Sequence, residues 1–585
     1  MSDLASEIEA DLIAVPSQLL AQLSRISSIV VADSGVITLT VAQTLAAGVD
    51  DGPDSVMAKV QGGSFVVTDA HVTDLALLAA LPVPPTSIQV SATAAAIVAD
   101  LTSGQSELLA HAARLSILDV SDGGTIALSV AQVTLASVDD GPSSVLARTI
   151  HGGLLITGAA IADFVTIEGL WRQPTGVTVL DTAANLQSDL AGGNSVLLAH
   201  AAEITSIASI EPSITFTLSV AQLAPSLAVL GNVASLFEVR VVDSAANIAA
   251  DLADPSSIVA QLTTVITGIT LTDGGTPTIT LSIARFDASR QALNFIDSPY
   301  HLDIADSDTA LQADLVSAGS ILRASVAAVH AITVTGGTVI TLTMTQAVQA
   351  GVAAVLALTT GITTVMVAEV AVADVPTVAA LGIAHLAMMI HDTAAAVEAD
   401  LTGAGSALEA QAGAIAGIVL TDVGTPTLLF DVARLTATSG LVSRISTPYT
   451  IAIVDTAAHV QSDLAGATPE LVTHAAALSS ITLTDGGTPT IALSMTQVST
   501  AGTVLARIGS SFHLAIADTA ANVQADLAST TPTLLTLLSS ITAITLTDGG
   551  TPSIVLTLAQ VAADSAALAL IASPWQLQVL DTAAA

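Results

Sequence analysis

The sequence predicts an α/β repeat solenoid, in which strand–helix coils stack a parallel sheet along a rod. Two observations predict it. Two short blocks of sequence alternate along nearly the whole chain, and Asp-Leu pairs recur at regular intervals. Such periods are typical of solenoids, in which each coil packs against its neighbours. An all-β solenoid is the alternative, since the low aromatic content suits a thin core of either kind.

The first block has the pattern of a strand followed by a helix. It appears as VTVLDTAANLQSDL from Val177 and as VRVVDSAANIAADL from Val239. Period-two apolar residues lead into alanine-rich sequence with high helix propensity. An aspartate at the junction is expected to cap the helix, because the N-cap position favours side-chain oxygens. The predicted caps are Asp181, Asp243, Asp306, Asp392, Asp455 and Asp518.

The second block contains an Asp-Gly-Gly-Thr-Pro turn between two Thr/Ile strands, as in ITLTDGGTPTITLS from Ile269. Its aspartates are candidate Ca²⁺ ligands, because the turn could place carboxylates near backbone carbonyls. The preferred interpretation is an Asx turn in which glycine supplies a positive φ. The glycine-rich nonapeptide of calcium-binding β-rolls is missing from these blocks. The candidate ligands are Asp273, Asp485 and Asp548, and no other cofactor is expected.

The Asp-Leu pairs set the repeat length. Their spacings are 62 to 63 residues in short units and 86 to 89 residues in long units. A long unit is interpreted as three coils and a short unit as two, since the difference matches one strand–helix coil. We predict one continuous solenoid over residues 1–585 with a C-terminal half-repeat at 574–585. Its units end near residues 12, 101, 190, 252, 315, 401, 464 and 527.

Composition excludes several classes of function. Fifty acidic residues against twelve basic ones give a formal net charge of −38, which repels nucleic acid. The chain has no cysteine and therefore no disulfide or thiolate chemistry. Residues 324–368 contain no Asp, Glu, Lys or Arg, but threonine alternates there with aliphatic residues. This alternation predicts strands rather than a transmembrane segment.

The sequence also argues against an enzyme. Solenoid enzymes that act on polysaccharides need paired acids or basic residues in a groove, with aromatic rings on which sugars stack. Tryptophan and tyrosine occur only at Trp171, Trp575, Tyr300 and Tyr449, and the only lysine is Lys59. No nucleophile elbow, P-loop, zinc-protease or dinucleotide motif is found. We therefore predict that the chain is not an enzyme.

The two blocks resemble tandem repeats of very large bacterial surface and secreted proteins. Those repeats are rich in Ala, Thr and Asp and read DTAANIQADL and ITLTDGGTPTITLT, close to the copies from Asp181 and Ile269. The resemblance covers nearly the whole chain and implies a structural or adhesive role outside the cell. It also implies export by a type I-like route, and the acidic N-terminal residues do not have the pattern of a cleavable signal.

The two ends of the chain have the pattern of two halves of one repeat. The C-terminal sequence WQLQVLDTAAA supplies a strand and Asp581, whereas the N-terminal sequence MSDLASEIEADL supplies the following helix. Uncapped solenoid ends expose strand edges that a second copy can cover. We therefore predict head-to-tail self-assembly into an extracellular filament or matrix fibre. The predicted interface is Leu4, Ile8, Leu12, Trp575, Leu577, Val579, Leu580 and Asp581.

A surface-layer protein or adhesin is the alternative function. Its copies would assemble through their sides, and Ca²⁺ would bridge their acidic faces. The expected partner is in either case another copy of the chain, with cell-surface or polysaccharide contacts as a further expectation. The expected location is outside the cell or on its surface.

Overall fold

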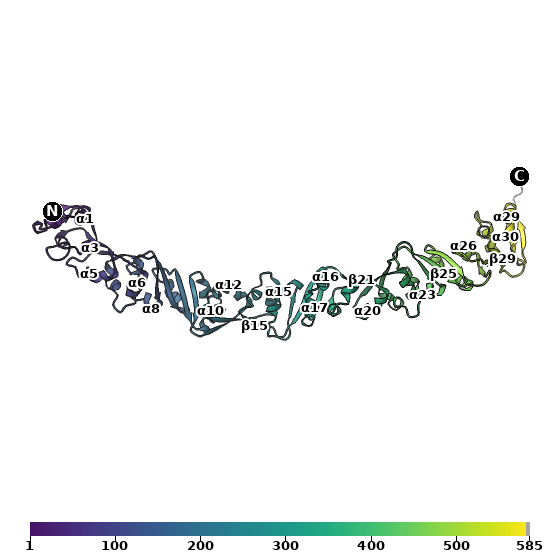
Figure 1. The fold of residues 1–585 in the computed structure, drawn as a ribbon, viewed down its shortest axis with the longest axis horizontal. Helices are drawn as coiled ribbons and strands as arrows, with labels where there is room; N and C mark the ends of the chain where they lie inside the picture. The colour runs from purple at the N-terminus through teal and green to yellow at the C-terminus, as the bar shows by residue number, and fades with distance from the viewer. Residues whose placement is uncertain (581–585) are drawn as a thin grey trace. The chain divides into compact units, whose positions relative to one another are not determined.

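The computed structural model describes residues 1–580 as an α/β protein made of short parallel sheets and short helices (Figure 1). The chain divides into two compact units. The first contains residues 1–279 and 288–301, and the second contains residues 280–287 and the described residues from 302 onward. Each unit repeats the same strand–helix alternation, so the predicted α/β class is confirmed. The prediction of one continuous solenoid over the whole chain stays a prediction.

The first unit contains four sheets, with strand orders β1-β2-β4, β3-β5-β6-β7-β9, β8-β10-β11-β12 and β13-β14-β15. Neighbouring strands in all four are parallel. The strands are β1 (Ser2–Asp3), β2 (Ile29–Val31), β3 (Val36–Thr40), β4 (Val60–Gln61), β5 (Ser64–Ala70), β6 (Ser87–Ala92), β7 (Leu115–Val120), β8 (Thr125–Ser129), β9 (Thr149–Ile150), β10 (Gly153–Ala159), β11 (Gly176–Asp181), β12 (Ile204–Ser209), β13 (Ser213–Leu218), β14 (Leu236–Asp243) and β15 (Ile266–Leu271).

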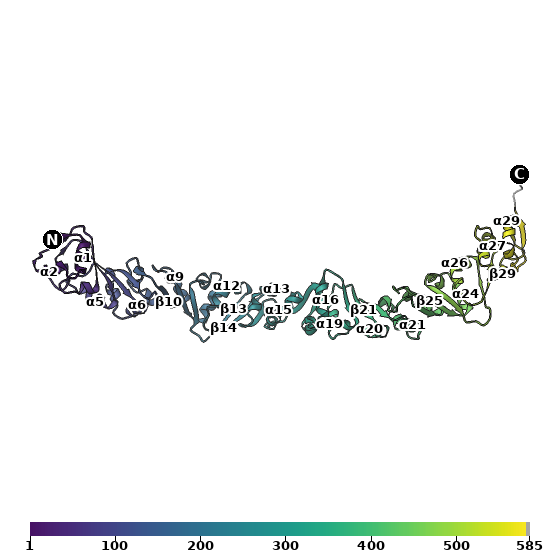
Figure 2. The ribbon, with the colours of Figure 1, turned by 45° about the horizontal axis from the view of Figure 1, so that its top comes forward.

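The helices of the first unit cover the sheets, as α12 does beside β13 and β14 (Figure 2). The α-helices are α1 (Ala5–Ile13), α2 (Gln18–Ala21), α3 (Val41–Thr44), α4 (Val56–Lys59), α5 (Leu75–Ala79), α6 (Ala94–Leu101), α7 (Glu107–Ala110), α8 (Val130–Val133), α9 (Phe164–Glu168), α10 (Ala183–Ala191), α11 (Val196–Ala199), α12 (Val220–Leu230), α13 (Ala245–Ala253) and α14 (Ile258–Gln261). The 3-10 helices are η1 (Leu23–Arg25), η2 (Val72–Asp74), η3 (Ala112–Arg114), η4 (Leu146–Arg148) and η5 (Ile161–Asp163). Strand β16 (Thr278–Leu281), helix α15 (Ile283–Leu293) and strand β17 (His301–Ser307) contain residues of both units.

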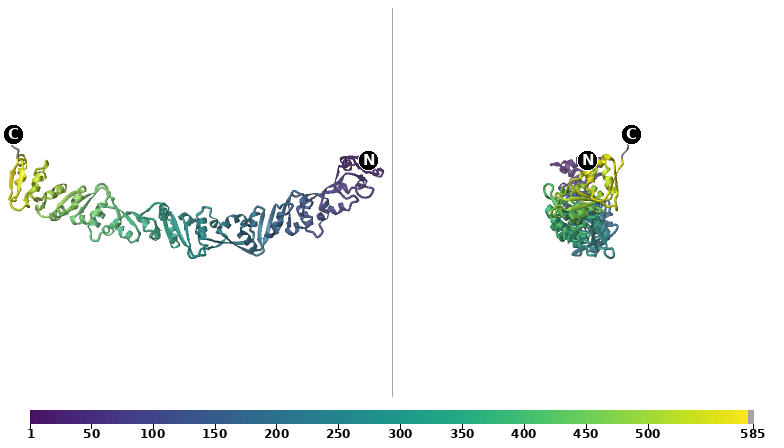
Figure 3. Two further views of the ribbon diagram at one scale, coloured as in Figure 1. Left: turned by 180° about the vertical axis from the view of Figure 1, so that it is seen from behind. Right: turned by 90° about the vertical axis from the view of Figure 1, so that its right-hand side faces the viewer.

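The second unit has the same organisation, and its elements follow one another in chain order (Figure 3). Its strands are β17 (His301–Ser307), β18 (Ala331–Thr335), β19 (Val339–Thr343), β20 (Thr359–Thr360), β21 (Thr364–Val370), β22 (Leu386–Asp392), β23 (Ile415–Leu420), β24 (Thr427–Phe430), β25 (Thr450–Asp455), β26 (Leu478–Leu483), β27 (Thr490–Leu493), β28 (His513–Asp518), β29 (Ile541–Leu546), β30 (Ser553–Leu556) and β31 (Gln576–Val579). Its sheets have the orders β19-β21-β22-β23, β24-β25-β26, β27-β28-β29 and β30-β31, and β17, β18 and β20 lie side by side.

The helices of the second unit again alternate with the strands. They are α16 (Asp308–Val316), α17 (Ile321–Ser325), α18 (Met344–Ala347), α19 (Val352–Ala357), α20 (Val375–Ala379), α21 (Ala394–Thr402), α22 (Ala407–Ala410), α23 (Val432–Val442), α24 (Ala457–Leu464), α25 (Glu470–Thr473), α26 (Met495–Leu505), α27 (Ala520–Leu527), α28 (Thr533–Thr536), α29 (Leu558–Ala563) and α30 (Ser565–Leu568). The 3-10 helices are η6 (Val326–Ala328), η7 (Val372–Asp374) and η8 (Ala412–Ala414).

The helix of the first block buries a narrow apolar stripe. Helix α13 buries Ala245, Ile248 and Leu252, three residues at the spacing of one helix face. In the preceding strand β14 every second residue from Val239 onward is buried, as the period of a strand requires, and Val239 and Val241 have no exposed surface. Each coil therefore closes its core with aliphatic side chains from one strand and one helix, so that few aromatic rings are needed.

The predicted helix caps are one residue too early. The N-cap of α24 is Thr456, whose hydroxyl accepts a hydrogen bond from the N–H of His459, while Asp455 ends strand β25. The same shift applies to all six predicted aspartates. The observed caps after them are Thr182, Ser244, Ser307, Thr393, Thr456 and Thr519.

The Asp-Gly-Gly-Thr-Pro turn moves the chain from one sheet to the next. Strand β26 pairs with β25 before the turn, and β27 pairs with β28 after it. The turn uses Gly487 at a φ of +77°, a conformation that glycine adopts without steric cost. Because the two flanking strands belong to different sheets, the parallel sheet is divided into short sheets instead of running on as one.

Candidate assembly interface

The aspartate at the end of each first-block strand joins two coils. Asp455 accepts a hydrogen bond from the next N–H, of Thr456, through Oδ1 and one from Val432 of the preceding coil through Oδ2. Burial alone would raise the pKa of Asp455, but these N–H groups and His459 together hold the pKa below its ordinary value. The same cross-coil bond, with N···O distances of 2.8 to 3.0 Å, forms at Asp181, Asp243, Asp306, Asp392 and Asp518.

The aspartate of the second-block turn also reaches another coil. Oδ2 of Asp485 lies 2.6 Å from the N atom of Ala457, the first residue of helix α24. Asp273 and Asp548 bind Ala245 and Ala520 in the same way. The three candidate calcium ligands therefore serve as acceptors for a helix N-terminus, where negative charge is favourable. Among residues 1–580, no three His, Asp or Glu side chains are grouped so that they could hold a metal ion.

A third aspartate, from the Asp-Leu pair, fixes the short helix that follows. Asp189 accepts hydrogen bonds from the hydroxyl of Ser195 and from the N–H groups of Val196 and Leu197. Asp463 is the equivalent aspartate of a later repeat. There Pro469 occupies the position of Ser195, and it has no hydroxyl group. Burial raises the pKa of Asp463 despite its two N–H donors, and the nearby Glu470 adds to this. Three carboxylates per repeat thus set the register of the coils.

The last described coil is open on one side. Strand β31 pairs with β30, and all four of its residues are exposed. Leu577 is 40% and Val579 50% exposed. The residues at the equivalent positions of the other first-block strands, four and two places before the aspartate, are at most 3% exposed: Val239, Val241, Leu302, Ile304, Ile451, Ile453, Leu514 and Ile516. Two core positions of the repeat are therefore uncovered at this end.

Other predicted interface residues of this coil differ in exposure. Trp575 is half-buried and Leu580 is exposed. Asp581 lies outside the described residues. Leu558, the first residue of α29, is also 61% exposed, whereas its equivalents Met495 and Val432 are 5% and 6% exposed. In the other coils this helix start is covered by the next first-block strand and its aspartate.

The first coil contains the complementary fragment. Asp3 ends the two-residue strand β1 and accepts from the N–H of Leu4, as Asp455 accepts from Thr456. Strand β1 pairs with β2 only at Ser2 and Asp3, so no strand of the described residues lies beside Ile26, which precedes β2. Ile26 is half-buried, whereas its equivalent Ile266 pairs with Val239 and is buried.

The predicted N-terminal interface residues fall into two groups. Leu4 takes the N-cap position of α1, where its side chain makes no capping hydrogen bond, and it is 43% exposed. Ile8 and Leu12 are buried within their own coil, because they form the apolar stripe of α1. Because they are already covered within their own coil, their side chains have little surface left for a contact with a second copy.

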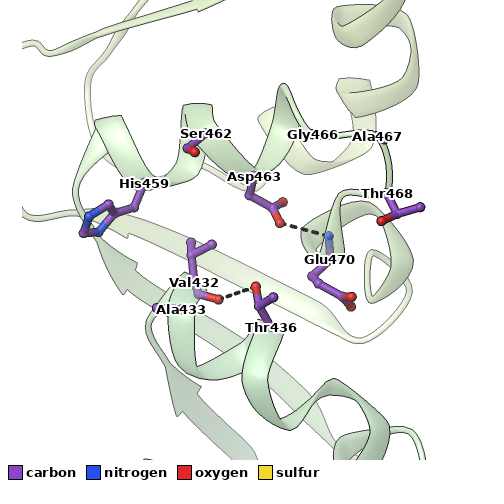
Figure 4. A pocket seen from close by; sticks show the side chains of 10 residues that line it. All are labelled: Val432, Ala433, Thr436, His459, Ser462, Asp463, Gly466, Ala467, Thr468 and Glu470. Atoms are coloured by element: carbon purple, nitrogen blue, oxygen red, sulfur yellow. Dashed lines mark hydrogen bonds between the residues drawn. The ribbon is translucent and has the colours of Figure 1, made fainter.

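Shallow clefts lie between neighbouring coils beside three of the Asp-Leu pairs. The cleft of about 390 Å³ in Figure 4 is lined by Val432, Ala433 and Thr436 on one side, and by His459, Ser462, Asp463 and Glu470 on the other. Related clefts lie beside Asp251 and Asp189. In Figure 4 Asp463 points toward the N–H of Glu470, so its carboxylate is used within the coil.

A serine, a histidine and a glutamate meet between α23 and α25. The Ser439 hydroxyl lies 2.6 Å from Oε2 of Glu470 and 3.0 Å from Nε2 of His474. Burial lowers the pKa of His474, and Glu470 opposes this change. In a catalytic triad the acid binds the other ring nitrogen, whereas here the serine and the glutamate approach the same one. The geometry is that of a packed polar contact between coils.

Comparison of the chain with protein-family models and with curated proteins finds no match. The assignment of a role therefore depends on the geometry of the coils and their ends.

Four residues that the sequence analysis missed complete this picture: Glu7, Ile26, Leu558 and Asp564. Glu7 and Asp564 differ in residue type from the other copies of the repeat, whereas Ile26 and Leu558 are apolar like their equivalents and differ in exposure. Glu7 stands where Asn185 and Asn522 donate to the strand-end aspartate, and Asp564 stands where Thr438 and Ala501 are buried. A position-by-position alignment of the copies could have found Glu7 and Asp564, but not Ile26 or Leu558.

Proposed function

We propose that the chain is a structural protein that assembles head-to-tail, with the last coil of one copy stacked on the first coil of the next. The observation that carries this proposal is the exposure of Leu577 and Val579 at positions that are buried in the other coils. Covering two such side chains removes apolar surface from water, which favours association. A second copy is the occupant that fits, because its first coil has the matching gap beside β2.

The repeat phase gives the register of the joint. Asp581 and Asp3 are equivalent positions, 578 residues apart. Strand β31 of one copy would lie end to end with β1 of the next copy, and both would pair with the segment that leads into β2 of the next copy. Leu577 would then lie beside Ile26 of the next copy. Asp3 of that copy would then accept a hydrogen bond from the N–H of Leu558, as Asp518 does from Met495. The contact is parallel β-augmentation, in which backbone hydrogen bonds supply much of the affinity.

We infer that the strand–helix units continue as a solenoid along the chain and through this joint. The cross-coil bonds of the strand-end aspartates support this inference, since they repeat at separations of 20 or 23 residues. A heterologous contact that uses a different surface on each copy does not close upon itself unless the rotation returns to the start. The expected product is therefore a filament. Its location outside the cell is proposed from the composition and the repeat resemblance.

Deletion of residues 574–585 tests the proposal. The truncated chain should fold and remain monomeric in sedimentation and in negative-stain electron microscopy, while the full chain forms filaments. A matched control is Leu429→Asp, which places a charge on an exposed strand residue far from either end. Filaments formed equally by the truncated chain would overturn the joint. Sheets that dissolve with EDTA would instead support lateral assembly by divalent ions.

A further inference from the structure

Both terminal coils of the proposed joint contain carboxylates at positions that are occupied by uncharged side chains in other coils. The C-terminal example is Asp564, which is only 2% exposed. Its Oδ2 atom has no hydrogen-bond partner among the described residues. The equivalent positions contain Ser226, Thr438 and Ala501, all buried and uncharged. An ionised carboxylate without a partner is costly at such a site.

The neighbouring copies show what a protonated Asp564 can do. The hydroxyl of Thr438 donates to the carbonyl oxygen of Arg434 at 2.7 Å, and Ser226 donates to Gln222 in the same way. The equivalent carbonyl in the last coil belongs to Gln560. A carboxylic acid can supply this donor, whereas a carboxylate can only accept.

The helix containing Asp564 is interrupted at that residue. Helices α12, α23 and α26 each run for eleven residues through the equivalent position. In the last coil, α29 ends at Ala563 and α30 begins at Ser565. Burial raises the pKa of Asp564, and the carboxylate of Asp526 at the end of α27 adds to the effect. Asp526 is the charged group that faces Asp564, and both of its oxygens already accept N–H groups of α28.

The N-terminal example is the pair of Asp3 and Glu7. In three other copies an asparagine side chain donates to the strand-end aspartate, with N···O distances of 2.6 to 2.7 Å at Asn185, Asn247 and Asn522. The remaining copies have an uncharged alanine or a histidine at this position, at Ala310, Ala396 and His459. Glu7 replaces the asparagine donor by a second acid, and a hydrogen bond to Asp3 together with its charge raises the pKa of Glu7.

Other charged groups around the first helix are already engaged. Asp33 accepts from the N–H groups of Ala5 and Gly35, and Glu9 accepts from Thr38. Asp11 accepts from the helix start at Ser17 and its two following N–H groups. The N-terminal ammonium of Met1 donates to the carbonyl oxygen of Ser28. None of these described contacts neutralises the Asp3–Glu7 pair.

We propose that uptake of protons by Asp564 and by the Asp3–Glu7 pair promotes end-to-end joining, so that assembly is switched on by mild acid. This inference rests on the proposed head-to-tail function. Each proton comes from solvent and converts an acceptor into a donor, toward the Gln560 carbonyl at one end and between the two acids at the other. The first change gives the last coil a donor like those of Ser226 and Thr438, and the second gives the first coil a donor like that of Asn185.

The test compares assembly of the full chain at about pH 5 and about pH 7.5. We expect the concentration needed for filament formation to be about tenfold lower at the acidic pH, which corresponds to about 1.4 kcal/mol per contact. The double variant Glu7→Asn with Asp564→Ser installs the groups found at Asn185 and Ser226. It should assemble at both pH values as the natural chain does in acid. Asp431→Ser is the matched control, because Ser219 and Ser494 occupy its position in other coils.

Three results would contradict the switch. Filaments that form equally at both pH values would overturn it and leave head-to-tail assembly intact. Salt at about pH 7.5 that reproduces the whole acid effect would indicate general charge screening instead of titration at these residues. Intact monomers at both pH values, for the natural chain and the double variant alike, would overturn head-to-tail assembly itself.

Discussion

The Oδ2 atom of Asp518 lies 2.8 Å from the backbone N atom of Met495, the first residue of the helix in the preceding coil. Oδ1 of the same side chain accepts from Thr519 and from the amide of Asn522. One buried carboxylate therefore joins a strand end, a helix start and a neighbouring coil.

Replacing Asp518 by alanine should destabilise the coils on both sides. The change leaves the N–H of Met495 without its acceptor, and an unsatisfied buried donor costs about 1 to 3 kcal/mol. Hydrogen exchange of residues 495–505 should become faster in the variant. The control variant Asp431→Ser removes an exposed carboxylate of the same unit and should leave this exchange unchanged. Unchanged protection in Asp518→Ala would mean that the carboxylate does not hold the two coils together.

Asp50 should make the first unit less stable as the pH rises. It is 1% exposed, and its Oδ2 has no hydrogen-bond partner among the described residues. Burial raises the pKa of Asp50 to about 6, opposed by the N–H of Val83 and aided by Asp51. Because the folded pKa lies above the ordinary value of 3.8, the free energy of unfolding falls as the pH increases through this window.

The variant Asp50→Asn should therefore raise the melting temperature of the first unit at about pH 7.5 and change it little at about pH 4. The gain at the higher pH is expected to be about 1 to 3 kcal/mol, the cost of an unsatisfied buried group. Asp54→Asn removes the same charge from an exposed side chain and serves as the control. Equal shifts for the two variants would contradict a specific effect of burial.

Gly152 should not tolerate a side chain. Its φ is +67°, and an added Cβ would lie 2.5 Å from the carbonyl oxygen of Gly124 and 2.9 Å from Cγ1 of Val120. Gly152→Ala should therefore destabilise the protein by more than about 1 kcal/mol, because alanine is strained at this positive φ and its Cβ has too little space. Gly104→Ala meets no atom within 4 Å and should be almost neutral. Thermal unfolding should show a lower melting temperature for Gly152→Ala and an unchanged one for Gly104→Ala, and equal melting temperatures would contradict this prediction.

Val579→Asp should prevent assembly without unfolding the chain. The side chain is half exposed in the described structure, so a charge is tolerated there in the monomer. In the proposed joint the same carboxylate would be buried without a partner, which is costly. Sedimentation should show monomers whose circular dichroism matches that of the natural chain. Val454→Asp, at an exposed position of strand β25, should still form filaments.

The sequence predicted the strands and helices well because each block combines period-two strands with a helix of strong propensity. The N-caps were predicted one residue early, since Asp455 and Thr456 both contain an oxygen that can cap, and only the backbone decides between them. The division into short sheets was not predictable, because the turn at Asp485 does not reveal which strands pair on either side. The partner of that aspartate lies 28 residues away, beyond the reach of local patterns.

The candidate interface was predictable in part. The repeat phase identified Leu577 and Val579, because their positions are apolar in all copies. It also suggested Ile8 and Leu12, which are apolar for a different reason, namely packing within their own coil. Position alone could not separate these two causes of apolar character. The exposure of Leu558 required the structure, since it depends on what covers the helix start.

The cross-coil bonds use backbone N–H groups as donors, and this makes the units interchangeable. A 63-residue unit such as that between Asp455 and Asp518 has the same carboxylate acceptor and the same backbone donor at each of its two boundaries. Duplication or loss of a whole unit creates no contact that the chain does not already contain. We therefore expect that a chain with one whole unit more or fewer keeps the same contacts between coils and the same two terminal coils.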